Sequence, residues 1–241
     1  MLACLTPAPQ RSAEGNSSAP DPSAEQIVAK MVSRNQLRAA ALRGFTGRRV
    51  YQLRYRGFPR DESAEMVVAV HYTAPSTKDF TVLSESGSRF IIKHVLKRLL
   101  TSEQEAQTPE NRQETALTPR NYSFQLLRAE ATPEGRCYVL SVQPKIANKF
   151  LYRGDVWVDA KDFAVARIDA EPAENPSIWI SRTHIEQKYS KLGPFWLPQQ
   201  NESTTKIRLG GTATLSIDYQ NYTLSAETNI PAEDGQPSQE P

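Results

Sequence analysis

Alternation of apolar and polar residues with a period of two runs through most of the chain, and it limits the folds open to this sequence more than any other feature. Before residue 88 it marks three segments: 47–56, 65–73 and 79–84. After residue 121 it marks seven more: 122–129, 136–143, 150–159, 164–171, 178–190, 196–209 and 212–222. Such alternation is typical of strands with one face on a core and the other in water. The sequence therefore predicts about ten strands.

The connections between these segments favour an antiparallel sheet. No helical segment alternates regularly with the strands, so a parallel sheet of βαβ units is not expected. Turn signals join several neighbours directly, as at 57–61, 133–135 and the Gly-Gly pair 210–211. The predicted fold class is mainly β (α+β), with a large curved antiparallel sheet or incomplete barrel.

Helical spacing interrupts this pattern in two places. Near the N-terminus, Ser23 is a good N-cap, and four apolar residues recur at helical spacing before about Leu42. In the middle of the chain, residues 88–100 form an amphipathic pattern that could act as a lid on the sheet. A capping-box pattern at Ser102 predicts a second helix to about residue 116, which Pro109 would end or kink early.

Composition at the two ends predicts flanking segments around one domain. Residues 1–21 are expected to be a leader remnant and a flexible linker, residues 22–225 the folded domain, and residues 226–241 a disordered tail. The start is typical of a truncated signal peptide whose true start codon lies upstream. Leu2-Ala3-Cys4 also resembles the end of a lipobox, which would make Cys4 a lipidation site; otherwise the leader is simply cleaved.

Charge and chemistry-bearing residues argue against several functional classes. The 29 basic and 27 acidic residues are too balanced and too dispersed for a nucleic-acid partner. No apolar run reaches the ~18 residues of a membrane span. His71, His94 and His184 form no metal-ligand or catalytic spacing, and Cys4 and Cys137 have no His near them in sequence. We therefore expect no enzyme activity, no metal and no cofactor.

A strongly bent sheet closed by helices leaves a concave face that side chains need not fill. If this face is apolar, it is a pocket for an apolar ligand; the alternative is an ordinary packed core, and the pattern does not separate the two. The candidate lining residues are Tyr51, Leu53, Tyr55, Met66, Val68, Val70, Phe90, Ile91, Val95, Leu99, Phe124, Leu126, Trp157 and Trp179.

Three stretches carry a resemblance to a known family. Residues 152–159 read Tyr-Arg-Gly-Asp-Val-Trp-Val-Asp, and a short polar turn then leads to a strand that contains Arg167. Residues 189–198 read Tyr-Ser-Lys-Leu-Gly-Pro-Phe-Trp-Leu-Pro, and residues 217–222 resemble a closing strand. Together with the order of helix, strands, helical insertion and strands, residues 22–222 resemble the LolA/LolB-like outer-membrane lipoprotein-sorting (lipoprotein carrier) family.

This resemblance implies a non-catalytic carrier in the periplasm or cell envelope. Its ligand would be the acyl chains of lipoproteins or another lipid, held in the concavity of the sheet beneath the helices. Peripheral contact with a membrane and an envelope protein as partner are compatible with it. Arg54 and Arg56 lie on a predicted strand, but nothing marks either as the family's functional arginine. The alternatives are an envelope sensor or scaffold acting by protein–protein interaction, and an outer-membrane receptor lipidated at Cys4.

Overall fold

The computed structural model describes residues 21–146, 148, 150–174, 180–208 and 210–226. Ten strands in this part of the chain form one antiparallel sheet in the order β3-β2-β1-β10-β9-β8-β7-β6-β5-β4. The strands are β1 Leu42–Gly57, β2 Glu62–Thr73, β3 Thr77–Gly87, β4 Tyr122–Thr132, β5 Gly135–Pro144, β6 Tyr152–Asp159, β7 Val165–Pro172, β8 Ile180–Leu192, β9 Phe195–Ile207 and β10 Gly211–Ala226. The predicted fold class is confirmed.

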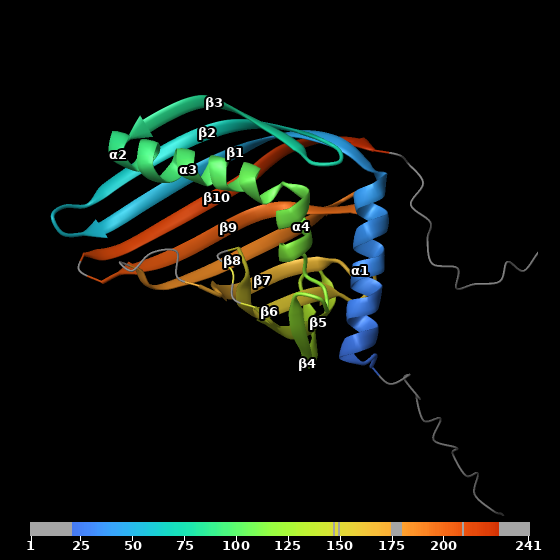
Figure 1. Cartoon of the computed structure of the whole chain (residues 1–241). Coiled ribbons are helices and arrows are strands. Elements are labelled where there is room, and N and C mark those ends of the chain that lie inside the picture. The colour runs from blue at the N-terminus through green and yellow to red at the C-terminus, as the bar shows by residue number, and fades with distance from the viewer. Residues whose placement is uncertain (1–20, 147, 149, 175–179, 209, 227–241) are drawn as a thin grey trace, which may run out of the picture.

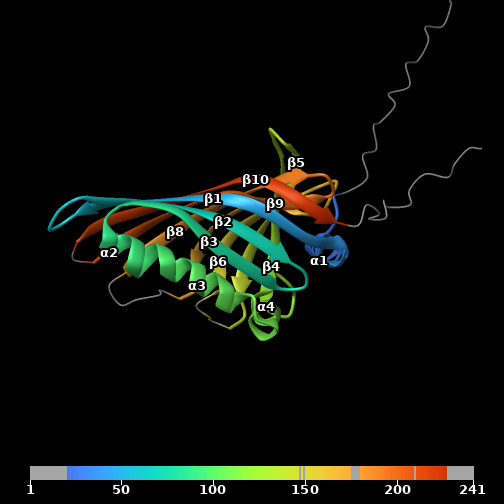
Figure 2. The same cartoon turned by 90° about the horizontal axis from the view of Figure 1, so that it is seen from above.

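The sheet is strongly twisted and curved, and its helices lie on the concave face (Figures 1 and 2). Strand register carries this face across the molecule from Leu53 in β1 to Leu215 in β10 and Ser203 in β9. From there it continues through Ile185 in β8 to Ala170 in β7. Side chains from strands far apart in the sequence therefore share one hollow surface.

Helix α1, Ala24–Ala41, begins where the sequence predicts. The Ser23 hydroxyl accepts from the Gln26 backbone N–H at 3.3 Å, and the Gln26 side chain accepts from the Ser23 N–H at 2.9 Å. This reciprocal capping box satisfies two backbone donors that the helix itself leaves without partners. The helix buries Ile27 and Met31 against strands β4 to β7, and β1 follows it without a loop.

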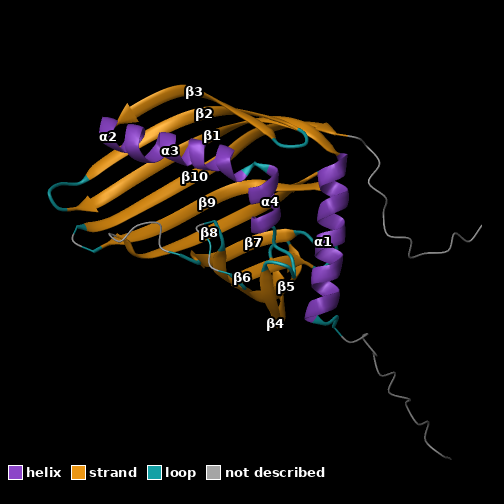
Figure 3. Cartoon of the chain, viewed as in Figure 1, coloured by secondary structure: helices purple, strands orange, loops and turns teal. Residues whose placement is uncertain are grey.

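The mid-chain helical segment differs from the prediction. One continuous helix runs through α2 Arg89–Ile91, the π-helical turn η1 Ile92–Leu96 and α3 Lys97–Ala106. We call residues 89–106 the lid helix, because it lies across the concave face over β1 to β3 (Figure 3). The expected new start at Ser102 is wrong, because residue 102 lies inside α3.

Helix α4, Pro109–Thr115, starts after the lid helix instead, with Thr108 as N-cap. Its Oγ1 accepts from the Asn111 backbone N–H at 3.4 Å. Pro109 is therefore not a break within a helix but the first residue of one. Proline suits this position because its missing N–H would have no helical partner there.

Two apolar clusters fill different parts of the concave face. The α1 cluster packs α1 on β4 to β7 through residues Ile27, Val28, Met31, Tyr122, Tyr138, Leu140, Val142, Leu151, Val156, Val158, Phe163, Ile168 and Ala170. The lid cluster packs the lid helix on β1 and β2 through residues Tyr51, Leu53, Ala64, Met66, Val68, Val70, Ile91, Ile92, Leu96 and Leu100. No helix in the described part of the chain is long and apolar enough to cross a bilayer.

Candidate ligand-binding cavity

A cavity of about 660 Å³ opens between the lid helix and the sheet. Its volume falls within the usual range of small-molecule sites, ~300–1,000 Å³. Most of the side chains that line it are apolar and come from β1, the β1–β2 hairpin, the lid helix and strands β8 to β10. They are Leu53, Tyr55, Phe58, Pro59, Arg60, Glu62, Phe90, Ile91, Val95, Leu99, Ile180, Ser203, Thr205, Ile207, Ala213 and Leu215. We call this space the lid cavity.

The predicted concave-face residues on β1, β2 and the lid helix fall into two groups. Six of them line the lid cavity: Leu53, Tyr55, Phe90, Ile91, Val95 and Leu99. Four others, Tyr51, Met66, Val68 and Val70, are buried in the lid cluster and do not line the cavity. The sequence left open whether this face is a pocket or a packed core, and each of these descriptions fits part of the face. Between the lid helix and β2 the face is packed, and toward strands β8 to β10 and the β1–β2 hairpin it is open.

Phe124 and Leu126 lie on the same face but at a distance from the lid cavity. Both pack on the α1 cluster. A second cavity of about 330 Å³ lies beside α1 and is lined in part by Tyr152, Ile168 and Tyr189. Neither Phe124 nor Leu126 lines it, so these two residues act as core.

Trp157 was expected on the concave face, and this is wrong. Val156 and Val158 point into the α1 cluster, and because side chains alternate along β6, Trp157 projects from the opposite face. There its indole N–H donates to Glu130 at 2.6 Å, and the Arg167 guanidinium lies 4.6 Å from the ring centroid. Trp179 and Cys4 lie outside the described residues.

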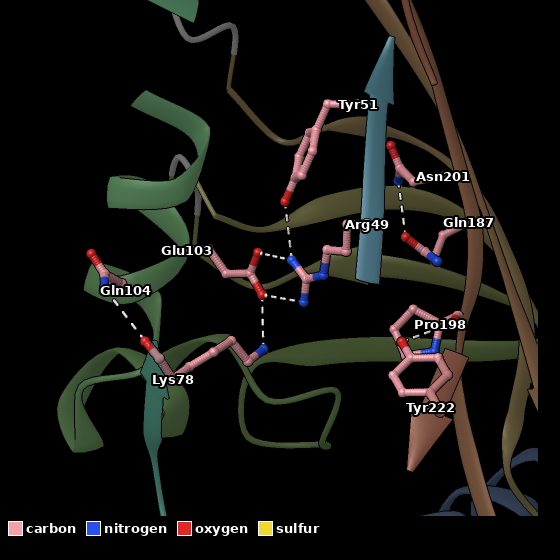
Figure 4. A network of polar contacts seen from close by, with 9 residues as sticks. All are labelled: Arg49, Tyr51, Lys78, Glu103, Gln104, Gln187, Pro198, Asn201 and Tyr222. Atoms are coloured by element: carbon pink, nitrogen blue, oxygen red, sulfur yellow. Dashed lines mark hydrogen bonds and ion pairs between the residues drawn. The ribbon is translucent and has the colours of Figure 1, made fainter. Parts of the chain in front are cut away.

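An ion pair between a buried arginine and a partly buried glutamate ties the lid helix to the sheet (Figure 4). Arg49 on β1 is only 4% exposed, and its two terminal nitrogens lie 2.5 and 3.1 Å from the carboxylate oxygens of Glu103 on α3. Lys78 on β3 binds the same carboxylate at 2.8 Å, and Arg49 also donates to the Tyr51 hydroxyl at 3.2 Å. Aromatic rings complete the enclosure, with Tyr219 at 4.8 Å from the guanidinium carbon. We call Arg49, Glu103 and Lys78 the latch.

The latch shifts the pKa values of its members in the directions that keep them charged. Burial alone would raise the pKa of Glu103, but hydrogen bonds and charge from Arg49 and Lys78 lower it below the usual carboxyl range. Burial would likewise lower the pKa of Arg49, and the bonds to Glu103 reverse this and raise it. Desolvation raises the pKa of the neighbouring Tyr219 hydroxyl, which stays neutral. The latch is therefore a charged group held inside an otherwise apolar layer.

Sequence reasoning missed Arg49, although a signal was present. Residues 49, 51, 53 and 55 share one face of β1, so Arg49 is a charged residue on the apolar side of an amphipathic strand. Glu103 follows Leu96 and Leu100 on one side of the lid helix, at spacings of seven and three residues. A buried arginine requires such a partner. Arg54, by contrast, is exposed on the other face of the strand.

Polar side chains occupy the concave face between the two clusters. Asn201 on β9 donates to the Gln187 side chain on β8 at 3.0 Å (Figure 4), and the hydroxyls of Thr183 and Thr205 lie 3.1 Å apart. Thr205 also lines the lid cavity. One wall of the cavity therefore offers uncharged hydrogen-bonding groups, Arg60 and Glu62 add charged groups at the β1–β2 hairpin, and the rest of the lining is mainly apolar.

The three histidines are separate from this cavity. His184 faces Asp169 at 3.6 Å, His71 lies 3.2 Å from the Thr73 hydroxyl, and the ring of His94 packs on that of Phe90 at 4.8 Å. Among the described residues, no group of three or more His, Cys, Asp or Glu side chains could hold a metal ion. The expectation that the chain does no chemistry stays a prediction.

Comparisons with known proteins give no close relative. No family model matches the chain, and no curated protein matches it. Solved structures similar to it include a DUF1329 family protein from Desulfovibrio piger, at 15% identity and a TM-score of 0.42 over 83% of this chain and 92% of that one. A LolA superfamily protein from Nitrosomonas europaea is 13% identical, with a TM-score of 0.36 over 88% of this chain and 96% of that one.

An outer membrane lipoprotein-sorting protein domain from Vibrio parahaemolyticus is 10% identical, with a TM-score of 0.41 over 88% of this chain and 95% of that one. Structures of the kind that the sequence resembles are thus among those to which this chain is similar. Because identity and TM-score are low in all three, the function has to be inferred from the geometry of the cavity itself.

Proposed function

We propose that this protein carries an acyl chain, of a lipoprotein or of another lipid, in the lid cavity. The observation behind this proposal is an open, mainly apolar cavity of about 660 Å³ between strands β8 to β10 and the lid helix, which the latch and the lid cluster hold on the sheet. Apolar surface left open in a monomer is costly unless a ligand covers it. A flexible hydrocarbon chain suits such a lining, because it needs no specific polar partner.

The expected strength of binding is compatible with carriage. Each buried methylene contributes ~0.8 kcal/mol, so ten of them contribute on the order of 8 kcal/mol, which corresponds to a micromolar dissociation constant. Such a ligand is held firmly and still released. We further propose that this happens in the periplasm or cell envelope, where acyl chains have to cross water between two membranes.

The alternatives predict other features. A sensor or scaffold of this fold whose concave face is filled needs no cavity under its lid, so the open cavity favours the carrier. The lipidated receptor depends on Cys4, which lies outside the described residues, and differs from the carrier in its anchor rather than in its pocket. The carrier and the lipidated receptor would use the same cavity.

Blocking the cavity tests the proposal. Ala213 on β10 lines the lid cavity, and Ala213→Phe should fill part of it and lower the uptake of an apolar fluorescent dye at least tenfold. Native mass spectrometry of wild-type protein purified from a bacterial envelope should reveal bound acyl lipid, and the variant should have lost it.

The matched control is Thr212→Phe, the neighbouring residue on the same strand, whose side chain points to the opposite face. It should bind dye and lipid as the wild type does. Equal dye uptake by wild type and Ala213→Phe, together with an absence of lipid in the purified protein, would refute the carrier function.

A further inference from the structure

The mouth of the lid cavity carries two strongly exposed aromatic side chains. Phe58, in the β1–β2 hairpin, is 81% exposed, and Phe90, in the first turn of the lid helix, is 67% exposed. Both line the lid cavity. The β1–β2 hairpin and the start of the lid helix, which carry them, lie at the same end of the sheet, at the left in Figure 1. Large apolar rings with this much contact to water are unfavourable unless another surface covers them.

Hydrogen bonds hold the backbone of Phe58 in place. Its N–H donates to the carbonyl of Gly210 at 2.9 Å, and its own carbonyl accepts from the Tyr55 hydroxyl at 2.6 Å. The same hydroxyl lies 2.7 Å from the Gly210 carbonyl. These hydrogen bonds tie the β1–β2 hairpin, which carries the exposed ring, to the β9–β10 turn.

Basic side chains are frequent on the lid helix, which carries Phe90, and near the hairpin that carries Phe58. Residues 89–101 of the lid helix include Arg89, Lys93, Lys97 and Arg98 and no acidic residue; Glu103 and Glu105 follow in its last turns. These four residues are exposed, as are Arg60 on the β1–β2 hairpin and Arg208 near the β9–β10 turn. Arg56 and Lys206 are also exposed, but they pair with Thr212 and therefore project from the other face of the sheet. Acidic groups are fewer: Asp61 accepts from the Gly57 N–H, Glu62 pairs with Arg60, and Glu85 pairs with Lys97.

We propose that this end of the protein docks on an anionic lipid bilayer, with Phe58 and Phe90 inserted among the lipids and the basic side chains on their headgroups. Exposed aromatic rings within a basic, acid-poor helical surface are what binding at a bilayer interface requires. Docking in this way places the mouth of the lid cavity against the membrane. A chain can then pass between pocket and bilayer without crossing water, so the inference rests on the proposed carrier function.

The partner chemistry follows from charge complementarity. A bilayer of zwitterionic lipid offers the rings a place to insert but gives the basic residues no counter-charge, so binding should depend on anionic lipid. Each basic residue near an anionic surface strengthens the affinity for that surface about fivefold at moderate salt. Each inserted ring should add about tenfold.

Vesicle co-sedimentation of the full chain is the test. Vesicles of phosphatidylethanolamine with phosphatidylglycerol should bind the wild-type protein, and vesicles of phosphatidylcholine alone should bind it at least tenfold more weakly. Phe58→Ser and Phe90→Ser should each weaken binding to the anionic vesicles about tenfold. Lys93→Glu should weaken binding to the anionic vesicles at least fivefold and make that binding less sensitive to salt.

Two matched controls distinguish binding through this surface from non-specific adsorption. Leu192→Ser removes an apolar side chain that is 39% exposed at the β8–β9 turn, at the other end of the sheet. Arg48→Glu makes the same charge change as Lys93→Glu at an exposed position in the middle of β1. Both should bind vesicles as the wild type does.

The outcomes distinguish this inference from the carrier function. No binding of wild type to anionic vesicles, with lipid still present in the purified protein, would overturn the docking surface and leave the carrier standing. A second result would also overturn it: Lys93→Glu weakens vesicle binding, but Phe58→Ser and Phe90→Ser leave it unchanged. The adsorption would then be purely electrostatic. Loss of vesicle binding in both phenylalanine variants and in Lys93→Glu, with dye uptake unchanged in Lys93→Glu, whose side chain does not line the cavity, would support it.

Discussion

At the scale of single residues, the latch determines how firmly the lid lies on the sheet. Removing one member of a buried ion pair leaves the other without a partner in an apolar layer, which costs more than the pair contributes. Arg49 is the more deeply buried partner, since it is 4% exposed and enclosed by Tyr219 and Phe80. The pair of Arg60 with Glu62, whose arginine is 79% exposed, should contribute little by comparison.

We expect Glu103→Gln to lower the free energy of unfolding by about 3 kcal/mol, because it leaves the Arg49 guanidinium buried without its counter-charge. The double variant Arg49→Met with Glu103→Met should lose less free energy of unfolding than the single variants Arg49→Met and Glu103→Met lose together. Urea denaturation followed by circular dichroism measures both.

Arg60→Met is the control for this experiment, and it should change stability by no more than about 0.5 kcal/mol. A Glu103→Gln protein as stable as the wild type would mean that the latch does not hold the lid in solution.

At the scale of elements, the lid helix is the part that the sequence described least well. Its amphipathic pattern over 88–100 predicted a helix correctly. The π-helical turn at Ile92–Leu96 and the continuation to Ala106 have no signal in apolar spacing. The capping-box pattern at Ser102 misled because Leu99 and Leu100 continue the apolar side of the helix, and burial of that side outweighs a local cap.

The strands were easier to predict because their alternation has a period of two. Which face each residue takes was harder, as Trp157 illustrates: a large aromatic residue suggests a core, yet Val156 and Val158 already occupy the concave side. The glycine in the 152–159 motif has a structural reason that the sequence did not show. A Cβ at Gly154 would lie 2.3 Å from the Asp169 carbonyl oxygen, so no larger residue fits there. Such close approaches depend on the neighbouring strand and are invisible in a single sequence.

Hydrogen exchange should reveal the lid helix as a separate unit of lower stability. Amides of residues 97–106 are expected to exchange faster than those of β1 and β10, which are paired on both sides in the middle of the sheet. Arg49→Met should speed exchange in the lid helix further and leave β5 and β6 unchanged. Uniform exchange across lid and sheet would show that the lid opens only when the whole domain unfolds.

At the scale of the whole molecule, one hollow face serves two purposes. The α1 cluster and the packed part of the lid cluster stabilise the domain, and the open end of the same face supplies the cavity. The sequence predicted this face and six of the residues that line the cavity. It could not predict where packing ends and space begins, because that boundary depends on how far the lid helix lies from strands β9 and β10.

The most direct test of the central claim is methyl NMR of the protein with a bound acyl chain. Cross-relaxation should connect the chain to the methyl groups of Leu53, Val95, Leu99 and Leu215 in the lid cavity. None should connect it to Val139, which lies on the opposite face of the sheet beside Trp157. Contacts confined to Val139 and its neighbours, or no contacts at saturating ligand, would contradict the account, and the lid cavity would then have another role.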